Sequence, residues 1–142
     1  MSLPQRARAS AVCVHAGRLL CVRLRDPSTR VLQLFVPGGA IEPGEDPRAA
    51  AERETFEETG YRVLADPHLR RVARYEYVWD GTARAITTHF FRAQLSDPAA
   101  APEPVTDVAY NEGTAWLPLV QVESALGFHA QILAAVTSLL DP

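Results

Sequence analysis

Alternating apolar and polar positions predict strands over much of the chain. Residues 8–15 and 19–25 have strand-like patterns, and the short segment around Gly17 between them favours a hairpin. A further apolar run covers 31–36 and ends at Pro37-Gly38-Gly39, where proline interrupts pairing and glycine is free to turn. Residues 69–79 and 84–95 predict two long strands around Asp80-Gly81, a favoured hairpin turn.

Two segments instead have the signals of helices. Asp46 is a suitable N-cap, Pro47 suits the first helical position and Gly60 suits the C-terminal end, which predicts a helix over 47–59. Apolar residues at three- and four-residue steps predict an amphipathic helix over 128–140. With no repeat or linker in between, we expect one domain over 1–142, an α/β sandwich with a sheet between helices.

Composition narrows the class of protein. The 142 residues are 47% hydrophobic and 22% charged, and no apolar run approaches the ~18–20 residues of a membrane span, so no membrane partner is expected. The N-terminus lacks the apolar core of a secretory signal, which favours a cytoplasmic protein. Cys13 and Cys21 lie in apolar segments and are expected to be reduced core residues.

The charges are unevenly distributed. The net charge is −3, but residues 42–58 hold seven acids and two arginines, a local charge of −5 in a slightly basic remainder. This pattern favours a local cation site and argues against a nucleic-acid partner. All fourteen basic residues are arginine, which excludes mechanisms that need a catalytic lysine.

Three of these acids share one face of the predicted helix. At about 100° per residue, Glu54, Glu57 and Glu58 fall within one arc, with Ala49 and Phe56 opposite and expected to pack on the sheet, so that the glutamates face outward. A solvated acidic surface is one interpretation. Carboxylate oxygens beside a glycine-rich turn are also the hard ligands that suit Mg²⁺ or Mn²⁺.

The same segment resembles the Nudix box, G-x5-E-x7-R-E-U-x-E-E-x-G-U, where U is aliphatic. All seven invariant positions of that pattern are matched: Gly39, Glu45, Arg53, Glu54, Glu57, Glu58 and Gly60. Thr55 and Tyr61 stand at its two apolar positions. The resemblance implies the Nudix α/β/α sandwich, with a mixed β-sheet between helices, across nearly the whole chain.

The resemblance also implies roles for individual residues. Glu54, Glu57, Glu58 and the backbone carbonyl of Gly38 would be metal ligands, and the pair of Arg53 and Glu45 would orient the catalytic glutamates. The implied reaction is hydrolysis of a nucleoside diphosphate linked to a group X, with Glu54 as the first choice of base. In this family the base sometimes comes from a later loop, for which Glu112 is the best-placed candidate and Glu103 and Asp107 are others.

The substrate is less well defined by the sequence. We expect a nucleoside triphosphate, including oxidised forms, or a dinucleoside polyphosphate; a tyrosine at 77, sixteen residues after the box, weakly matches the second class. Aromatic residues that could stack on a base are Phe35, Tyr75, Tyr77 and Trp79, although strand aromatics more commonly pack in the core. Arginines that could meet phosphate are Arg23 and Arg74. His89 is interpreted as a structural histidine, with a substrate contact as the alternative.

Three further hypotheses stay open at this stage. The chain could be a non-catalytic Nudix module that senses a nucleotide or nucleotide sugar. It could also be an isoprenoid diphosphate isomerase, which would need a catalytic cysteine. Homodimers are frequent in families of this kind, although no residue here marks an interface.

Overall fold

The computed structural model describes residues 2–141, and its first elements build the centre of a sheet. The long strand β1 (Gln5–His15) turns at Ala16-Gly17, both with positive φ, into β2 (Arg18–Arg25), which confirms the first predicted hairpin. β3 (Leu32–Phe35) pairs with β2, and the short β4 (Gly38–Ala40) pairs with β1. Gly38 and Gly39 were predicted as a turn, whereas they form this short strand against β1.

The second half of the chain completes the sheet. β5 (Val63–Trp79) and β6 (Thr82–Leu95) form the second predicted hairpin, and both Asp80 and Gly81 have positive φ at its turn. β5 starts six residues before the predicted strand because a register shift between Ala65 and Arg70 lets the pairing continue past Pro67. β7 (Asn111–Pro118), which was not predicted, pairs with β2.

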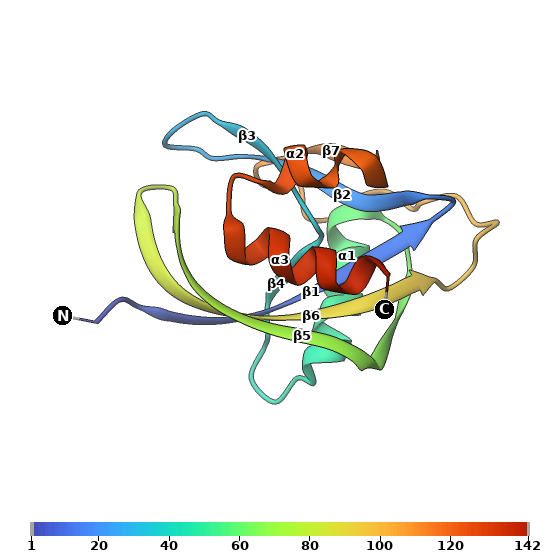
Figure 1. The fold of residues 1–142 in the computed structure, drawn as a ribbon, viewed down its shortest axis with the longest axis horizontal. Helices are drawn as coiled ribbons and strands as arrows, with labels where there is room; N and C mark the ends of the chain where they lie inside the picture. Colours follow the sequence, from blue (N-terminus) through green and yellow to red (C-terminus); the bar gives the residue numbers. More distant parts are fainter. Residues whose placement is uncertain (1, 142) are drawn as a thin grey trace.

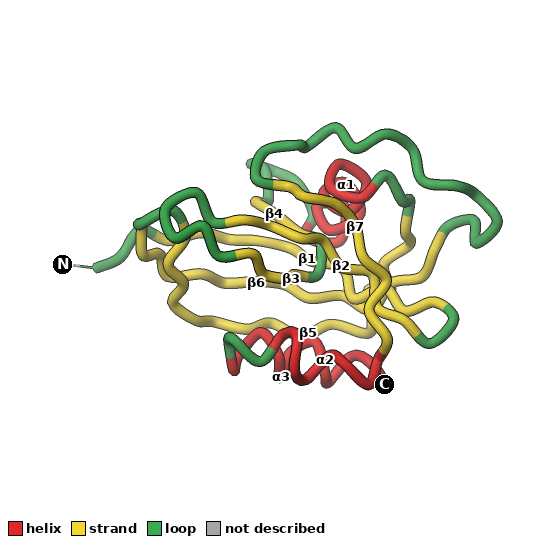
Figure 2. Tube along the Cα trace, turned by 90° about the horizontal axis from the view of Figure 1, so that it is seen from above, coloured by secondary structure: helices red, strands yellow, loops and turns green. Residues whose placement is uncertain are grey.

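The sheet is mixed, as expected. Its strand order is β3-β2-β1-β6-β5, with β4 added to β1 and β7 to β2. β1 and β6 run parallel, and the other pairings among residues 2–141 are antiparallel. The structure is therefore an α/β fold in which a mixed sheet lies between helices, as Figure 2 shows from above.

Helix α1 (Pro47–Thr59) covers one side of the sheet and has the predicted bounds. Asp46 accepts a hydrogen bond from the backbone N–H of Arg48, and Gly60 ends the helix at φ +77°. On the other side lie the 3₁₀ turn η1 (Leu119–Gln121), α2 (Val122–Leu126) and α3 (Ala130–Leu140) (Figure 1). α3 starts two residues later than predicted because His129 has extended backbone and caps it.

Two apolar clusters, one on each side, hold these layers together. The cluster under α1 is built mainly from small residues of β1, α1 and β6 with one large ring, Phe91. The cluster under α2 and α3 contains Phe90, Ile132 and Val136. Since β1 and β6 contribute alternate side chains to both clusters, the parallel pair is the common centre of the fold.

The buried face of α1 differs from the predicted one. Ala49 is exposed, and Phe56 is only half buried, with the guanidinium of Arg62 at 4.0 Å from its ring centroid. Ala50 and Ala51 instead face the sheet, and Glu58 on the same side is also buried. Small alanines let the helix lie close to β1, and this brings a glutamate into the interior where it has a backbone partner.

Within residues 2–141, no helix combines the length and the apolar composition needed to span a bilayer.

Candidate active site

The site is organised around one guanidinium on α1. Arg53 donates from Nε to Glu45 Oε2 at 2.8 Å and from Nη2 to Glu45 Oε1 at 2.9 Å, a bidentate pair. Its Nη1 reaches Glu54 Oε1 at 3.0 Å and Glu57 Oε2 at 3.1 Å, and Nη2 also reaches the carbonyl of Ala40 at 3.0 Å. The planar fork of arginine thus ties the loop before the helix, two glutamates of the helix and β4 together.

The two ends of this network differ in their electrostatics. The hydrogen bonds from Arg53 lower the pKa of Glu45 to about 2. Burial raises the pKa of Glu54, and Arg53 opposes this effect only in part. Glu45 is therefore a fixed anion that orients Arg53, whereas Glu54 is a better proton acceptor than an ordinary glutamate.

Glycine at position 39 lets the carboxylate of Glu54 lie against the backbone of β4. A Cβ at Gly39 would overlap all three atoms of that carboxyl group. The requirement for glycine here is thus a matter of close approach, since Gly39 does not have a positive φ.

Glu54, Glu57 and Glu58 form the glutamate row of α1, and Glu58 is its most buried member. Glu58 is 6% exposed and accepts a hydrogen bond from the Gly38 N–H at 2.8 Å. Burial raises its pKa to about 8, with smaller opposing effects of the Gly38 hydrogen bond and of Arg8. The Gly38 carbonyl accepts a hydrogen bond from Arg8 Nη2 at 3.0 Å, which leaves it a second lone pair for another ligand.

These groups suit a hard divalent cation by their chemistry, because they are carboxylate and carbonyl oxygens on one short row. Among residues 2–141, however, no three His, Cys, Asp or Glu side chains are arranged to hold a metal ion as they stand. Glu54 and Glu57 are held by Arg53, and Glu58 by the Gly38 amide. Glu54 and Glu58 each use only Oε1 in these hydrogen bonds, so each keeps its Oε2 oxygen available for an ion.

A cavity of about 270 Å³ opens beside this row. Aromatic rings form much of its wall: Phe35, Tyr75, Tyr77, Trp79 and Tyr110. Phe35 packs edge-on against Tyr77 and Trp79 at centroid distances of 6.1 and 6.2 Å. The four aromatic residues predicted to stack on a base thus line one cavity, and Tyr110, which was not predicted, joins them.

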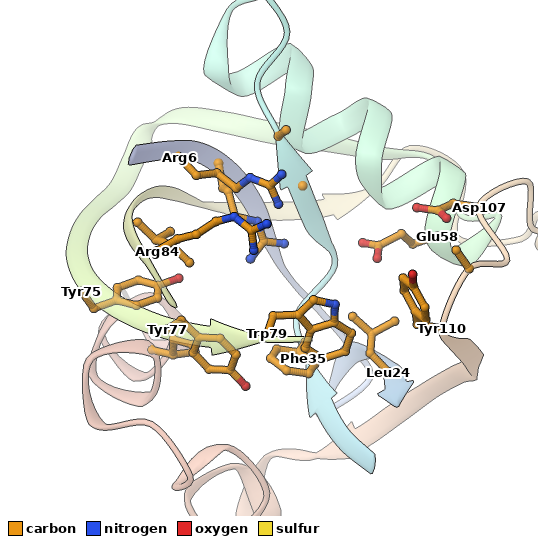
Figure 3. A pocket seen from close by; sticks show the side chains of 16 residues that line it. Arg6, Leu24, Phe35, Glu58, Tyr75, Tyr77, Trp79, Arg84, Asp107 and Tyr110 are labelled. Carbon is orange, nitrogen blue, oxygen red and sulfur yellow. The ribbon is translucent and has the colours of Figure 1, made fainter. Parts of the chain in front are cut away.

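Figure 3 shows charged groups on two sides of this cavity. Glu58 and Asp107 lie on one side, and Arg6 and Arg84 extend into it from the other. Arg8 also lines it. The arginines suggested from the sequence do not line it: Arg23 donates to the Thr114 carbonyl at 3.0 Å, and Arg74 is exposed.

The loop acids occupy three different places. Glu112 forms a bidentate ion pair with Arg25, including Nη2 to Oε1 at 3.1 Å, and is not among the residues that line the cavity. Glu103 pairs with Arg62 at 3.0 Å. Asp107 lines the cavity because the loop hydrogen-bonds to the end of α1, with the Asp107 N–H donating to the Glu57 carbonyl at 3.0 Å.

The structure therefore brings Asp107, and not Glu112, to the glutamates of α1. Sequence position alone favoured Glu112 because the pairing of β2 with β7, which places Glu112 near Arg25, was not predicted. The cavity arginines were also missed, although Arg6 and Arg8 stand two apart on β1 and so share one face.

The two departures from the sequence pattern are accommodated by packing. Thr55 is fully buried, and its hydroxyl donates to the Ala51 carbonyl at 2.7 Å. Tyr61 packs edge-on against Trp116 and accepts a hydrogen bond from the indole N–H at 3.3 Å. His89 lies on β6 outside the cavity lining, with burial and two arginines lowering its pKa.

Known proteins resemble this chain over most of its length. A family model for the NUDIX domain matches residues 4–137. A MutT-like protein from Streptomyces ambofaciens is 35% identical over 105 residues, which cover 68% of this chain and 61% of that protein. The chain spans no more than 61% of the length of the curated relatives it matches.

Solved structures share the fold at low sequence identity. A NUDIX hydrolase from Nitrosomonas europaea matches with a TM-score of 0.71 and 22% identity over 94% of this chain and 87% of its own. A binary complex of the C. elegans Ap4A hydrolase matches with a TM-score of 0.70 and 19% identity, over 94% and 93% of the two chains.

Proposed function

Because this chain belongs to the Nudix hydrolase family, we propose that it hydrolyses a phosphoanhydride bond in a nucleoside diphosphate linked to a group X, with Mg²⁺ as cofactor. The observation that carries the proposal is the Arg53 network, in which one guanidinium holds Glu45, Glu54 and Glu57 beside a cavity with aromatic and cationic walls.

The glutamates of α1 and the carbonyl of Gly38 would hold the ion. Their oxygen chemistry supports Mg²⁺, with Mn²⁺ as a substitute. When bound, the ion would neutralise phosphate oxygens and stabilise negative charge on the leaving phosphate.

The chain's own residues would divide the remaining work. Arg53, fixed by Glu45, would position Glu54 and Glu57, and the aromatic wall would hold a base by stacking. Glu54 would take a proton from the attacking water, since burial raises its pKa. Asp107 is the alternative base, because it lines the cavity together with Glu58; the ion pair with Arg25 disfavours Glu112.

A panel of nucleotides with Mg²⁺ or Mn²⁺, read by release of nucleoside monophosphate, tests the activity. We expect turnover by the wild type and a loss of about 10²–10⁴-fold in kcat for Glu54→Gln, the range for removal of a general base. Asp107→Asn, measured in parallel, separates the two candidate bases. Only the substitution that removes the actual base should abolish the pH dependence of kcat.

Glu57→Gln tests the metal site through Mg²⁺ affinity, measured by calorimetry without substrate. We expect weaker binding. Unchanged affinity together with no turnover of any nucleotide would contradict the proposal, and binding of a nucleotide without turnover would instead favour a sensing module. Sedimentation of the purified protein tests whether the chain forms the homodimer that is frequent in families of this kind.

A further inference from the structure

Three arginines converge on the cavity from the two central strands. Arg6 and Arg8 stand two apart on β1. Ile86 of the neighbouring β6 pairs with Arg6, and Arg84 stands two residues before Ile86. All three therefore project from the same face of paired strands, and Figure 3 shows Arg6 and Arg84 extending toward the cavity from the side opposite Glu58. Paired strands hold such groups more firmly than a loop would.

Among the described residues, this group has no ion-pair partner, since no carboxylate lies within ion-pair distance of Arg6, Arg8 or Arg84. Partial burial, and then repulsion from Arg84 and Arg8, lowers the pKa of Arg6. The arginines of this chain that do meet acids, such as Arg53, Arg25 and Arg62, lie elsewhere. An anion bound among the three would relieve their repulsion.

The three arginines lie apart from the glutamate row of α1. Glu58 and Asp107 stand across the cavity from Arg6 and Arg84 (Figure 3). Arg8 reaches the Gly38 carbonyl at 3.0 Å and so stands at the boundary with the row. A ligand that spans the cavity would meet Glu58 and Asp107 at one end and the arginines at the other.

We propose that Arg6, Arg8 and Arg84 form an anion subsite, so that the substrate carries a phosphate beyond the anhydride cleaved beside the glutamates. The inference rests on the proposed function and deepens it. The substrate is then a nucleoside triphosphate or a dinucleoside polyphosphate, and nucleotide sugars, in which X is uncharged, are poor substrates.

Matched substrate pairs test this selectivity. For each base, kcat/KM is compared between the triphosphate and a nucleotide sugar, such as ATP with ADP-glucose and UTP with UDP-glucose. We expect Arg6→Gln and Arg84→Gln to lower kcat/KM for triphosphates by about tenfold or more, the cost of a lost charge-assisted hydrogen bond. Nucleotide sugars should change by less than about twofold, because they have no group to place among the arginines.

Two control variants accompany these. Arg71→Gln removes an exposed arginine of β5 outside the cavity and should leave kcat/KM unchanged for both substrates of a pair. Arg84→Lys keeps the charge and should recover part of the lost activity toward triphosphates. An equal loss for both members of a pair would overturn the proposal, because the arginines would then serve only phosphates common to both.

Binding of inorganic tripolyphosphate to the protein in EDTA, measured by calorimetry, gives a readout independent of hydrolysis. The wild type should bind, and the double variant Arg6→Gln/Arg84→Gln should bind at least tenfold more weakly. Equal binding by both proteins overturns the subsite. If tripolyphosphate binding behaves as expected but no nucleotide is hydrolysed, the subsite stands and the proposed hydrolysis fails.

Discussion

Arg53 shows how much of this site depends on one side chain. Its guanidinium makes hydrogen bonds to three carboxylates and one carbonyl, which the planar group can satisfy together. The ammonium group of lysine has the same charge but only three donors on one atom. Charge alone therefore cannot replace the geometry.

We expect Arg53→Lys to lower kcat/KM by about 10–100-fold, the usual cost of losing a group that orients ligands. Stability should change by no more than about 1–2 kcal/mol, because the network is partly exposed. Steady-state kinetics at saturating Mg²⁺ and denaturant unfolding measure the two effects. Arg48→Lys, at an exposed position on the same helix, is the control and should match the wild type in both.

The pairing of Glu45 with Arg53 predicts a pH dependence of stability. The folded-state pKa of Glu45 is lowered from 4.5 to about 2. The folded state therefore favours the charged form, and this contribution is complete above pH 4.5 and disappears as the pH falls toward 2. Glu45→Gln cannot titrate, so its free energy of unfolding should lie below that of the wild type near pH 7.

Denaturant unfolding of both proteins between pH 2 and 7 measures this difference. The difference in free energy of unfolding between the wild type and Glu45→Gln should narrow steadily below about pH 4.5. A gap that stays constant with pH would show that the carboxylate charge does not contribute.

At the scale of the element, the distance between α1 and the sheet sets the position of the glutamates. Ala50 and Ala51 are fully buried against β1, so the helix lies as close as small side chains permit. The same closeness lets Glu58 reach the Gly38 amide. The element thus connects core packing to the site.

We expect Ala50→Leu to cost about 1–3 kcal/mol of stability by overpacking, and to lower activity because α1 is displaced from β4. Ala49→Leu, one residue earlier at an exposed position, should leave both unchanged. Thermal unfolding and kinetics measure the pair. Equal effects of the two substitutions would mean that α1 does not depend on close packing.

Gly39 on β4 and Gly60 at the end of α1 should differ in whether substitution affects activity or stability. Gly39→Ala would displace only the flexible end of Glu54, so we expect lower activity with little loss of stability. At Gly60, with φ +77°, a Cβ would overlap the backbone carbonyl of Glu103. Gly60→Ala should therefore destabilise the protein by more than Gly44→Ala, which has the same φ in open space.

Circular dichroism melting and kinetic assays of the three variants measure both properties. Equal losses of stability for Gly39→Ala and Gly60→Ala would contradict this prediction. They would show that the flexible Glu54 side chain yields no more easily than the Glu103 backbone.

At the scale of the molecule, the two sides of the sheet are joined by shared strands, and each side holds one cysteine. Cys13 belongs to the cluster under α1 and Cys21 to the cluster under α3. Burial raises the pKa of Cys13 to about 11 and that of Cys21 to about 12. Neither thiol is suited to catalysis in the native state, which argues against the isomerase hypothesis.

The thiols also report whether the chain unfolds as one domain. Because β1 and β6 serve both clusters, we expect one cooperative transition in which both thiols become reactive at the same denaturant concentration. Cys13→Ala and Cys21→Ala each leave one thiol, which reacts with a chromogenic disulfide at pH 8 once it is exposed. The two variants therefore report the unfolding of the two apolar clusters separately. Two distinct midpoints would contradict a single domain.

Local signals were sufficient where one segment determines its own structure. The helix over 47–59 is set by its cap, its proline and its terminal glycine, and each hairpin turn contains a glycine, Gly17 or Gly81, with positive φ. The long-range pairing of β7 with β2 and of β4 with β1 left no comparable signal, because a strand's partner depends on the whole sheet.

The sequence by itself determined the family pattern, the α/β architecture and the spacing that puts three glutamates on one helix. Only the tertiary structure decided which face of α1 is buried, that Asp107 and not Glu112 reaches the cavity, and that Arg6, Arg8 and Arg84 line it. The physical reason is range. Caps, turns and helical spacing act within a few residues, whereas burial and charge partners arise between elements that meet only in the folded chain.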